Sequence, residues 1–221
     1  MNITIIGAGN IGTTLARQFA RQGHEVTLAF SHDEQRLQAL AHEVGHHVRA
    51  ASPAAAVSMA DVVVLSVPWE VIDVAIEQMG DVTGKVVIDT TNHFSQGLVD
   101  LGGVSSLAYN QRRLPGAKVA KAFNTITAGY QAEVAAGEHR PISMFYAASE
   151  PEAKKVCSEL VSSIGFVPVA LDGPAEMLME APRRQGAVYG EGYLPADAEK
   201  IAETARYDLV KASQLADALK Q

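Results

Sequence analysis

Short apolar runs alternate with longer amphipathic stretches along almost the whole chain. The short runs are rich in β-branched and aromatic residues, which predicts strands. Eight strands are expected, at residues 2–9, 24–30, 46–50, 61–68, 85–92, 117–125, 141–149 and 166–172. The run DVVVLSVP at 61–68 is almost continuously apolar. Such a run is typical of a strand that is buried on both faces of a sheet.

Between the strands, apolar residues recur with the spacing of amphipathic helices. Helices are expected at residues 10–23, 33–45, 52–60, 70–80 and 151–165, and inside 97–116 before Pro115. This alternation predicts an α/β fold, in which an open and mainly parallel sheet carries helices on both faces. From about Ala175 the chain becomes mostly helical. We expect one domain over 1–174 and a small helical extension over 175–221, which contributes to a substrate site or a dimer interface.

Three glycines stand within six residues directly after the first predicted strand. The stretch reads Gly7-Ala8-Gly9-Asn10-Ile11-Gly12 and opens a predicted helix. This context is what the G-x-G-x-x-G fingerprint of a doubly wound, Rossmann-like dinucleotide-binding domain requires. Gly7 then allows a tight turn, Gly9 lets a pyrophosphate approach the backbone, and Gly12 lets the helix pack on the strand. The N–H groups of Asn10 and Ile11 would point at the phosphates, an arrangement that the helix dipole favours.

The residues after the second strand indicate which dinucleotide binds. An acidic side chain at that strand end usually binds the ribose 2′-hydroxyl of NAD. Here the strand ends in Phe30, Ser31 and His32, and the first carboxylate, Asp33, follows inside the helix. Ser31, His32 and Arg36 could instead hold a 2′-phosphate. The sequence therefore favours NADP over NAD.

Ligands of such sheets bind outside the carboxyl ends of the strands. Further residues at these strand ends should line the crevice, namely Ser66, Val67, Pro68, Asn92, Lys121, Ala122 and Asn124. Asn92 and Asn124 are expected to position a nicotinamide amide or an acceptor ring. Lys121 is expected to stabilise developing negative charge or to bridge strand and phosphate. Trp69 either covers the site or caps the core.

Composition and charge exclude several classes of protein. The chain has 221 residues, 48% of them apolar, and a formal net charge of −7, which argues against a nucleic-acid partner. No apolar stretch reaches the ~18 residues of a membrane span. No signal peptide precedes the first strand. The single cysteine, Cys157, falls on the apolar phase of a predicted helix and is expected in the core. We expect a cytoplasmic protein.

Residues 42–46 read His-Glu-Val-Gly-His, which matches the helical pattern of zinc proteases. Gly45 is a typical helix stop. The next predicted strand follows at once, so the helix is too short to present both histidines. No third ligand is evident, and we expect no metal site.

With these motifs in place, the sequence resembles the deazaflavin-dependent NADP reductase family. The same module is similar to the cytoplasmic part of six-transmembrane ferric reductases. The resemblance runs from residue 1 to about residue 182. Its most specific parts are the Gly-x-Gly-Asn-Ile-Gly turn and Lys-Ala-Phe-Asn-Thr at 121–125. The resemblance implies NADP at the glycine turn and a flavin-like partner stacked against the nicotinamide.

Two positions depart from the family pattern. Its Ala-Asn-Ser-Arg ribose loop reads Ala-Phe-Ser-His at 29–32 here, and its Thr-Asn-Pro reads Thr-Asn-His at 91–93. His32 is partly titratable near neutral pH, so the preference for NADP should weaken as the pH rises. His93 adds a titratable group close to the expected nicotinamide. It either hydrogen-bonds a substrate or replaces a turn proline.

The expected activity is hydride transfer between the nicotinamide of NADPH and a flavin or deazaflavin, a small-molecule redox substrate. This chemistry needs orientation and exclusion of water more than acid–base help. Two alternatives stay open: reduction of a small imine or carbonyl, with His93 or Tyr109 as proton donor, and a non-enzymatic NADP sensor. The tail residues Arg183, Arg184, Tyr189 and Tyr193 are expected at the substrate or at a dimer interface. A homodimer is expected.

Overall fold

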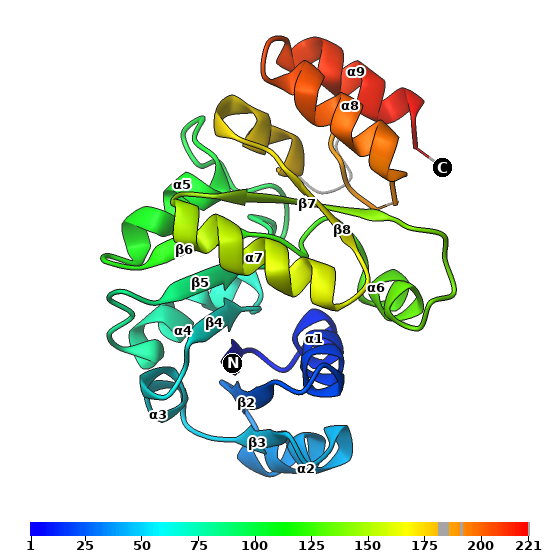
Figure 1. Ribbon diagram of the computed structural model, residues 1–221. Coiled ribbons are helices and arrows are strands. Elements are labelled where there is room, and N and C mark those ends of the chain that lie inside the picture. The colour runs from blue at the N-terminus through cyan, green and yellow to red at the C-terminus, as the bar shows by residue number, and fades with distance from the viewer. Residues whose placement is uncertain (181–185, 191, 221) are drawn as a thin grey trace.

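The computed structural model describes residues 1–180, 186–190 and 192–220 of the chain. All eight predicted strands are present and form one sheet (Figure 1). The strands are β1 Asn2–Ile6, β2 Glu25–Ala29, β3 Val48–Ala50, β4 Val62–Leu65, β5 Val86–Asp89, β6 Lys118–Lys121, β7 Ser143–Ala148 and β8 Val167–Ala170. Their order is β3-β2-β1-β4-β5-β6-β7-β8, with β7 antiparallel to β6 and the other neighbours parallel. The predicted Rossmann-like, mainly parallel sheet is confirmed.

The helices connect these strands. The α-helices are α1 Asn10–Arg21, α2 Glu34–Val44, α3 Pro53–Ser58, α4 Ile72–Met79, α5 Ser106–Arg113, α6 Ala128–Ala135, α7 Pro151–Ser163, α8 Pro195–Ala205 and α9 Leu209–Ala218, and the 3₁₀ helices are η1 Trp69–Val71 and η2 Gly173–Met179. The sequence did not predict α6, because its apolar residues do not separate onto one face. The local signal for α6 is a cap, since the Thr127 hydroxyl accepts a hydrogen bond from the Tyr130 N–H at 3.4 Å.

Two apolar layers cover the two faces of the sheet. The four residues of β4 are buried and alternate between these layers. Val63 and Leu65 join the layer that contains α3, α4, α8 and α9, whereas Val62 and Val64 join the layer that contains α1 and α7. Cys157 is fully buried in the second layer, as predicted.

The helical extension lies on the β7–β8 end of the sheet, where α8 and α9 are drawn in orange and red in Figure 1. Tyr193 anchors it, because this ring is 1% exposed and meets Phe145 edge-on at 5.6 Å. Its hydroxyl donates a hydrogen bond to the carbonyl oxygen of Ala216 at 3.0 Å. The extension therefore shares the core of the sheet. Within the described residues, no helix is long and apolar enough to cross a bilayer.

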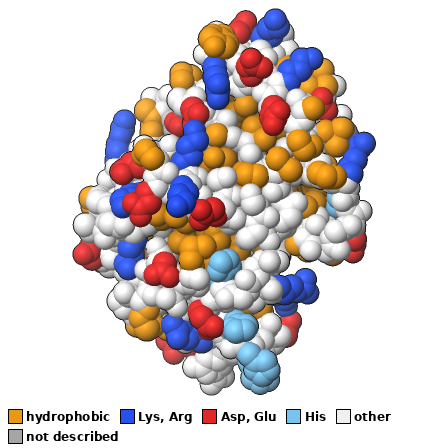
Figure 2. Space-filling view, viewed as in Figure 1, with side chains coloured by type: hydrophobic (Ala, Val, Ile, Leu, Met, Phe, Trp, Pro, Cys, Tyr) orange, Lys and Arg blue, Asp and Glu red, His pale blue; other side chains and the backbone are white. Residues whose placement is uncertain are grey.

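The strand order fixes where a ligand can bind. β1 lies between β2 and β4, so the connections that leave β1 and β4 run to opposite sides of the sheet. A crevice opens between their carboxyl ends at such a reversal point. Acidic and basic side chains are interspersed over the face shown in Figure 2, in keeping with a fold that binds through local geometry rather than a basic surface.

Candidate functional site

The glycine turn occupies this crevice, and its three glycines serve different purposes. Gly7 has φ +107°, and a Cβ there would stand 2.2 Å from the carbonyl oxygen of Ser66. A Cβ at Gly12 would stand 2.1 Å from the carbonyl oxygen of Gly7. A Cβ at Gly9 would meet nothing within 4 Å. Gly7 and Gly12 are therefore demanded by the packing of β1, α1 and β4, whereas Gly9 faces open space.

The first turn of α1 points into the same space. Gly9 is the N-cap and offers no side chain to cap the helix. Because Asn10 and Ile11 are the first two helical residues, their N–H groups have no acceptor inside the helix. The helix dipole adds partial positive charge at this end. The turn is thus suited to an anion such as a pyrophosphate.

Two adjoining pockets flank the turn. The first, here called the glycine pocket, is lined by Gly7, Ala8, Gly9, Phe30, Ser31, His32, Arg36, Leu37, Leu40, Ser66, Val67, Pro68 and Val71. The second, here called the aromatic pocket, has a volume of about 430 Å³ and is lined by Gly9, Asn10, Ile11, Ser66, Val67, Pro68, Trp69, Thr90, Thr91, Asn92, Phe94 and Tyr189. The two pockets share Gly9 and residues 66–68, so they form one continuous trough.

The glycine pocket ends in the loop after β2. Ser31, His32 and Arg36 are exposed and gather at its wall, as expected for a 2′-phosphate site. Asp33 is occupied as the N-cap of α2, because its carboxylate accepts the Arg36 N–H at 3.0 Å. Phe30 has φ +65°, a left-handed conformation that is rare for an aromatic residue. Strained positions of this kind cluster at ligand sites.

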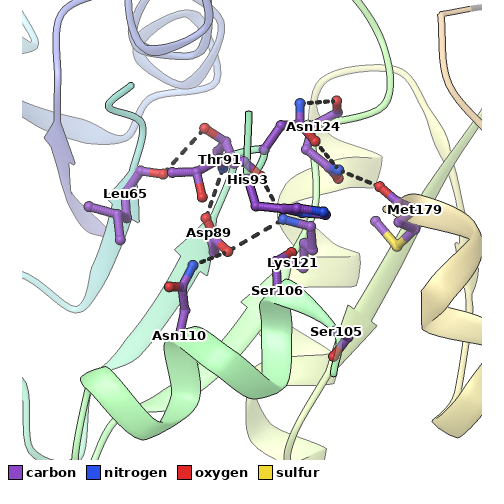
Figure 3. Close-up of polar contacts among 12 residues, drawn as sticks. Leu65, Asp89, Thr91, His93, Ser105, Ser106, Asn110, Lys121, Asn124 and Met179 are labelled. Atoms are coloured by element: carbon purple, nitrogen blue, oxygen red, sulfur yellow. Dashed lines mark hydrogen bonds and ion pairs between the residues drawn. The ribbon is translucent and has the colours of Figure 1, made fainter. Parts of the chain in front are cut away.

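The ends of β5 and β6 are tied together by two asparagines. The Asn124 amide Nδ2 donates to Asn92 Oδ1 at 3.0 Å and to the Met179 carbonyl oxygen at 3.0 Å (Figure 3). Asn92 Nδ2 donates back to the Asn124 carbonyl oxygen at 3.1 Å. Among the described residues, Asn124 Oδ1 and Thr91 Oγ1 are buried and have no hydrogen-bond partner. Thr91 lines the aromatic pocket, whereas Asn124 lies behind its wall.

Three residues predicted at the cofactor, Lys121, Ala122 and Asn124, are not among the residues that line the trough. Lys121 is 1% exposed, and its Nζ donates to the Thr91 carbonyl oxygen at 2.6 Å and lies 3.4 Å from Asp89 Oδ2. Asn110 Nδ2 binds the same carboxylate at 2.8 Å, beneath the strand end in Figure 3. The Lys121 ammonium therefore makes its contacts inside a buried polar network and does not face the trough. Ala122 is fully buried in the core. All three predictions are corrected: these residues support the strand ends from behind the trough wall.

His93 faces an acidic side chain that the sequence did not suggest. Its Nδ1 lies 3.0 Å from Oε2 of Glu180, and both side chains are less than 10% exposed. The other carboxylate oxygen of Glu180 accepts hydrogen bonds from the Ser106 N–H at 3.0 Å and hydroxyl at 2.8 Å. Burial alone would raise the pKa of Glu180, but His93, Lys121 and Ser106 together outweigh it and lower that pKa. Glu180 is therefore a buried carboxylate that stays ionised.

Aromatic residues form the outer wall of the aromatic pocket. Trp69 lines the pocket and its ring stands 5.9 Å from that of Tyr109. The Arg113 guanidinium lies 5.5 Å from the centre of each ring, which adds a cation–π contact. Trp69 also packs against the core, so it combines its two predicted roles. Tyr109 supports it and is not in the pocket lining.

The four tail residues have different outcomes. Tyr189 lines the aromatic pocket. Tyr193 is a core residue, for the reasons given above, and is corrected as a substrate contact. Arg183 and Arg184 lie outside the described residues.

The His-Glu-Val-Gly-His stretch does not form a helical pair of ligands. α2 ends at Val44, and Gly45 follows with φ +130°, so His46 lies beyond the helix. In the part of the chain that the structure describes, no group of three His, Cys, Asp or Glu side chains could hold a metal ion.

The sequence missed Thr90, Thr91 and Phe94 in the pocket lining and Glu180 beside His93. The first three continue the strand-end stretch that already contained Asn92, so extending that stretch would have found them. Glu180 follows η2 and is separated from His93 by most of a domain, so no local pattern reports it.

Comparison with known proteins agrees with this geometry. Residues 2–93 match the family described as NADP oxidoreductase, coenzyme F420-dependent. A hypothetical protein of Sinorhizobium meliloti is 31% identical, with a TM-score of 0.76 over 88% of this chain and 95% of that one. The N-terminal part of the chain, residues 2–93, therefore belongs to the coenzyme F420-dependent NADP oxidoreductase family. The protein is accordingly an NADP-dependent oxidoreductase.

Other solved structures share the fold. A proposed F420-dependent NADP reductase of Arthrobacter sp. FB24 is 28% identical, with a TM-score of 0.66 over 78% of this chain and 84% of that one. A pyrroline-5-carboxylate reductase of Coxiella burnetii is 15% identical, with a TM-score of 0.62 over 98% and 76%, which is a likeness of fold alone. No curated protein matches the chain.

Proposed function

We propose that this protein transfers a hydride between the nicotinamide of NADP(H) and the flat ring of a deazaflavin or flavin. The observation that carries the proposal is the wall of the aromatic pocket, where Trp69, Phe94 and Tyr189 surround the end of the dinucleotide trough. Aromatic side chains favour offset stacking with other flat rings. Phe94 is 52% exposed, so an apolar partner gains by covering it. The name of the Arthrobacter relative points to the same acceptor.

The residues present fit an NADP molecule laid along the trough. The open space beside Gly9, which a Cβ would fill, suits the pyrophosphate beneath the N–H groups of Asn10 and Ile11. Ser31 and Arg36 suit the 2′-phosphate of the adenosine end. Bound NADPH supplies a hydride from its nicotinamide ring.

The protein itself contributes the orientation of the nicotinamide ring and the exclusion of water from the reacting atoms. Thr91 and Asn92 line the aromatic pocket and can bind the carboxamide of a nicotinamide, which would fix the face of the ring that meets the acceptor. Asn92 is in turn held by the Asn124 amide, which also binds the Met179 carbonyl oxygen. The apolar wall keeps water from the reacting atoms, which suits a direct transfer between two stacked rings.

The test is stopped-flow oxidation of NADPH by the pure protein with a deazaflavin, then with FMN. Rapid transfer to either ring is expected, and Trp69→Ala and Phe94→Ala should each slow it at least 10-fold. Tyr207→Ala is the matched control, because Tyr207 is an 88% exposed aromatic residue in the turn between α8 and α9. Tight NADPH binding without transfer to either ring would overturn the proposal.

A further inference from the structure

His93 and Glu180 form a pair that hydride transfer between stacked rings does not use. His93 Nδ1 and Glu180 Oε2 are 3.0 Å apart, and among the described residues neither atom has a hydrogen-bond partner elsewhere. An ionised carboxylate enclosed in this way requires a donor. The donor within reach is a proton on Nδ1. Glu180 therefore fixes both the ring orientation and the nitrogen that carries the proton.

The second ring nitrogen of His93, Nε2, is not part of the contact with Glu180. Nε2 lies on the edge of the imidazole away from Glu180, and it is absent from the fully enclosed unpaired atoms of the described chain. Asn92 and Phe94, the neighbours of His93 in sequence, both line the aromatic pocket. The Trp69 ring, also in that lining, stands edge-on to the imidazole at 6.1 Å. His93 is 7% exposed and lies between two lining residues, although it is not itself part of the lining.

The charges around this pair keep it polarised. On the Nδ1 side, Glu180 is held ionised by Ser106 and by the charge of Lys121 from β6. Glu176 of η2 also interacts with Glu180, and burial followed by that interaction raises the pKa of Glu176. On the Trp69 side, the Arg113 guanidinium lies 5.5 Å from the centre of the Trp69 ring. The anionic group in direct contact with the imidazole is Glu180.

We propose that the His93–Glu180 pair is a proton-delivering dyad, which lets this protein reduce a small ketone or aldehyde with NADPH. A hydride acceptor of this class develops negative charge on oxygen and needs a proton. As the carbonyl carbon gains the hydride, its C=O π bond breaks and the oxygen takes the proton from Nε2, forming an alcohol. The imidazole is left neutral and regains its proton from water. A base oriented by a third group is the general arrangement for such transfers.

This inference rests on the NADP site but not on the deazaflavin or flavin as acceptor. A deazaflavin or flavin accepts the hydride with little acid–base help, so loss of the dyad should leave that transfer within a few-fold of its rate. Carbonyl reduction depends on the dyad. The two activities can therefore fail separately.

The experiment measures NADPH oxidation with cyclohexanone, benzaldehyde and a deazaflavin between pH 5.5 and 9. Wild type should reduce at least one carbonyl compound, faster at low pH because the reaction consumes a proton. His93→Asn should lose about 100-fold in kcat for that compound and lose the pH dependence. Its NADPH affinity, measured by fluorescence titration, should stay within 3-fold. His47→Asn is the matched control, because His47 Nδ1 also pairs with a glutamate, Glu25, at 2.7 Å but on the surface.

A readout without turnover covers variants that fold poorly. The ¹⁵N spectrum of the His93 ring in wild type should show the proton of the neutral form on Nδ1. In Glu180→Gln, a mixture of both tautomers is expected, because the side-chain amide can either donate or accept. No carbonyl reduction by wild type, or a His93→Asn variant with unchanged carbonyl kcat, would overturn the proposal. An Nε2-protonated ring in wild type would overturn it as well.

Discussion

The glycine turn allows a sharp separation of binding from folding. A methyl group at Gly9 would stand in open space, whereas one at Gly12 would overlap a backbone oxygen at 2.1 Å. Gly9 has φ −78° and ψ −169°, a conformation that alanine also adopts. We therefore expect Gly9→Ala to fold normally and bind NADPH poorly. Gly12→Ala should unfold more easily.

The magnitudes follow from the contacts at stake. A methyl group at Gly9 holds the pyrophosphate away from the Asn10 and Ile11 N–H groups, and each charge-assisted hydrogen bond contributes about 1.5–3 kcal/mol. Losing both weakens binding by about 3 kcal/mol or more, which is at least ~100-fold in Kd. The stability change at Gly9 should stay below about 1 kcal/mol, because a poorer N-cap is offset by lower entropy of the unfolded chain.

Gly12→Ala forces α1 away from β1. Overpacking of this kind costs about 1–3 kcal/mol, and each kcal/mol lowers the Tm of a chain this long by roughly 2–4 °C. Fluorescence titration with NADPH and thermal unfolding without ligand measure the two effects. A Gly9→Ala variant that binds NADPH within 3-fold of wild type would refute the reasoning, since no other consequence of that methyl group is expected.

Four further results are expected. Arg36→Ala should weaken NADPH binding about 10-fold and leave NADH binding unchanged in parallel titrations, because only the former carries a 2′-phosphate. The Glu180 pKa lies below its ordinary value of 4.5, so its stabilisation is present above that pH and is lost as the pH falls through the lowered pKa. The gap in free energy of unfolding between wild type and Glu180→Gln, about 2 kcal/mol at pH 7, should therefore close toward pH 3 in urea titrations. Asn124→Ala should raise the KM for NADPH several-fold in steady-state kinetics, because Asn92 Oδ1 loses the amide that donates to it. Lys121→Met should lower the Tm by about 6 °C or more in thermal scans, because it leaves the Asp89 carboxylate buried without a counter-charge.

The sheet and the trough could be predicted because they depend on local patterns. Eight strands were visible as β-branched runs, and the glycine turn carries its spacing within six residues. The short helix α6 was not predicted, because it lacks an apolar face and its local signal is the Thr127 cap. A pattern that lies within one element does not depend on distant contacts, so it predicts the structure of that element correctly.

Side-chain roles that depend on distant partners could not be predicted. Lys121 stands at a strand end, as a phosphate ligand would, yet Asp89 from the neighbouring strand turns its ammonium inward. His93 could be placed near the site, but its partner Glu180 is brought in by η2 at the far end of the domain. Sequence position gives the edge of the sheet at which a residue lies; only tertiary packing decides what its side chain faces.

The buried charges of Asp89 and Lys121 hold the end of β5 in place. Enclosing Asp89 and Lys121 is costly, and an apolar pair of similar size would stabilise the fold at least as well. Their hydrogen bonds end on the backbone of Thr91, through its carbonyl oxygen at 2.6 Å and its N–H at 2.8 Å. An apolar pair could fill the space but could not hold that peptide. Because Thr91 and Asn92 line the aromatic pocket, the ion pair is better explained by the placement of the strand end than by stability.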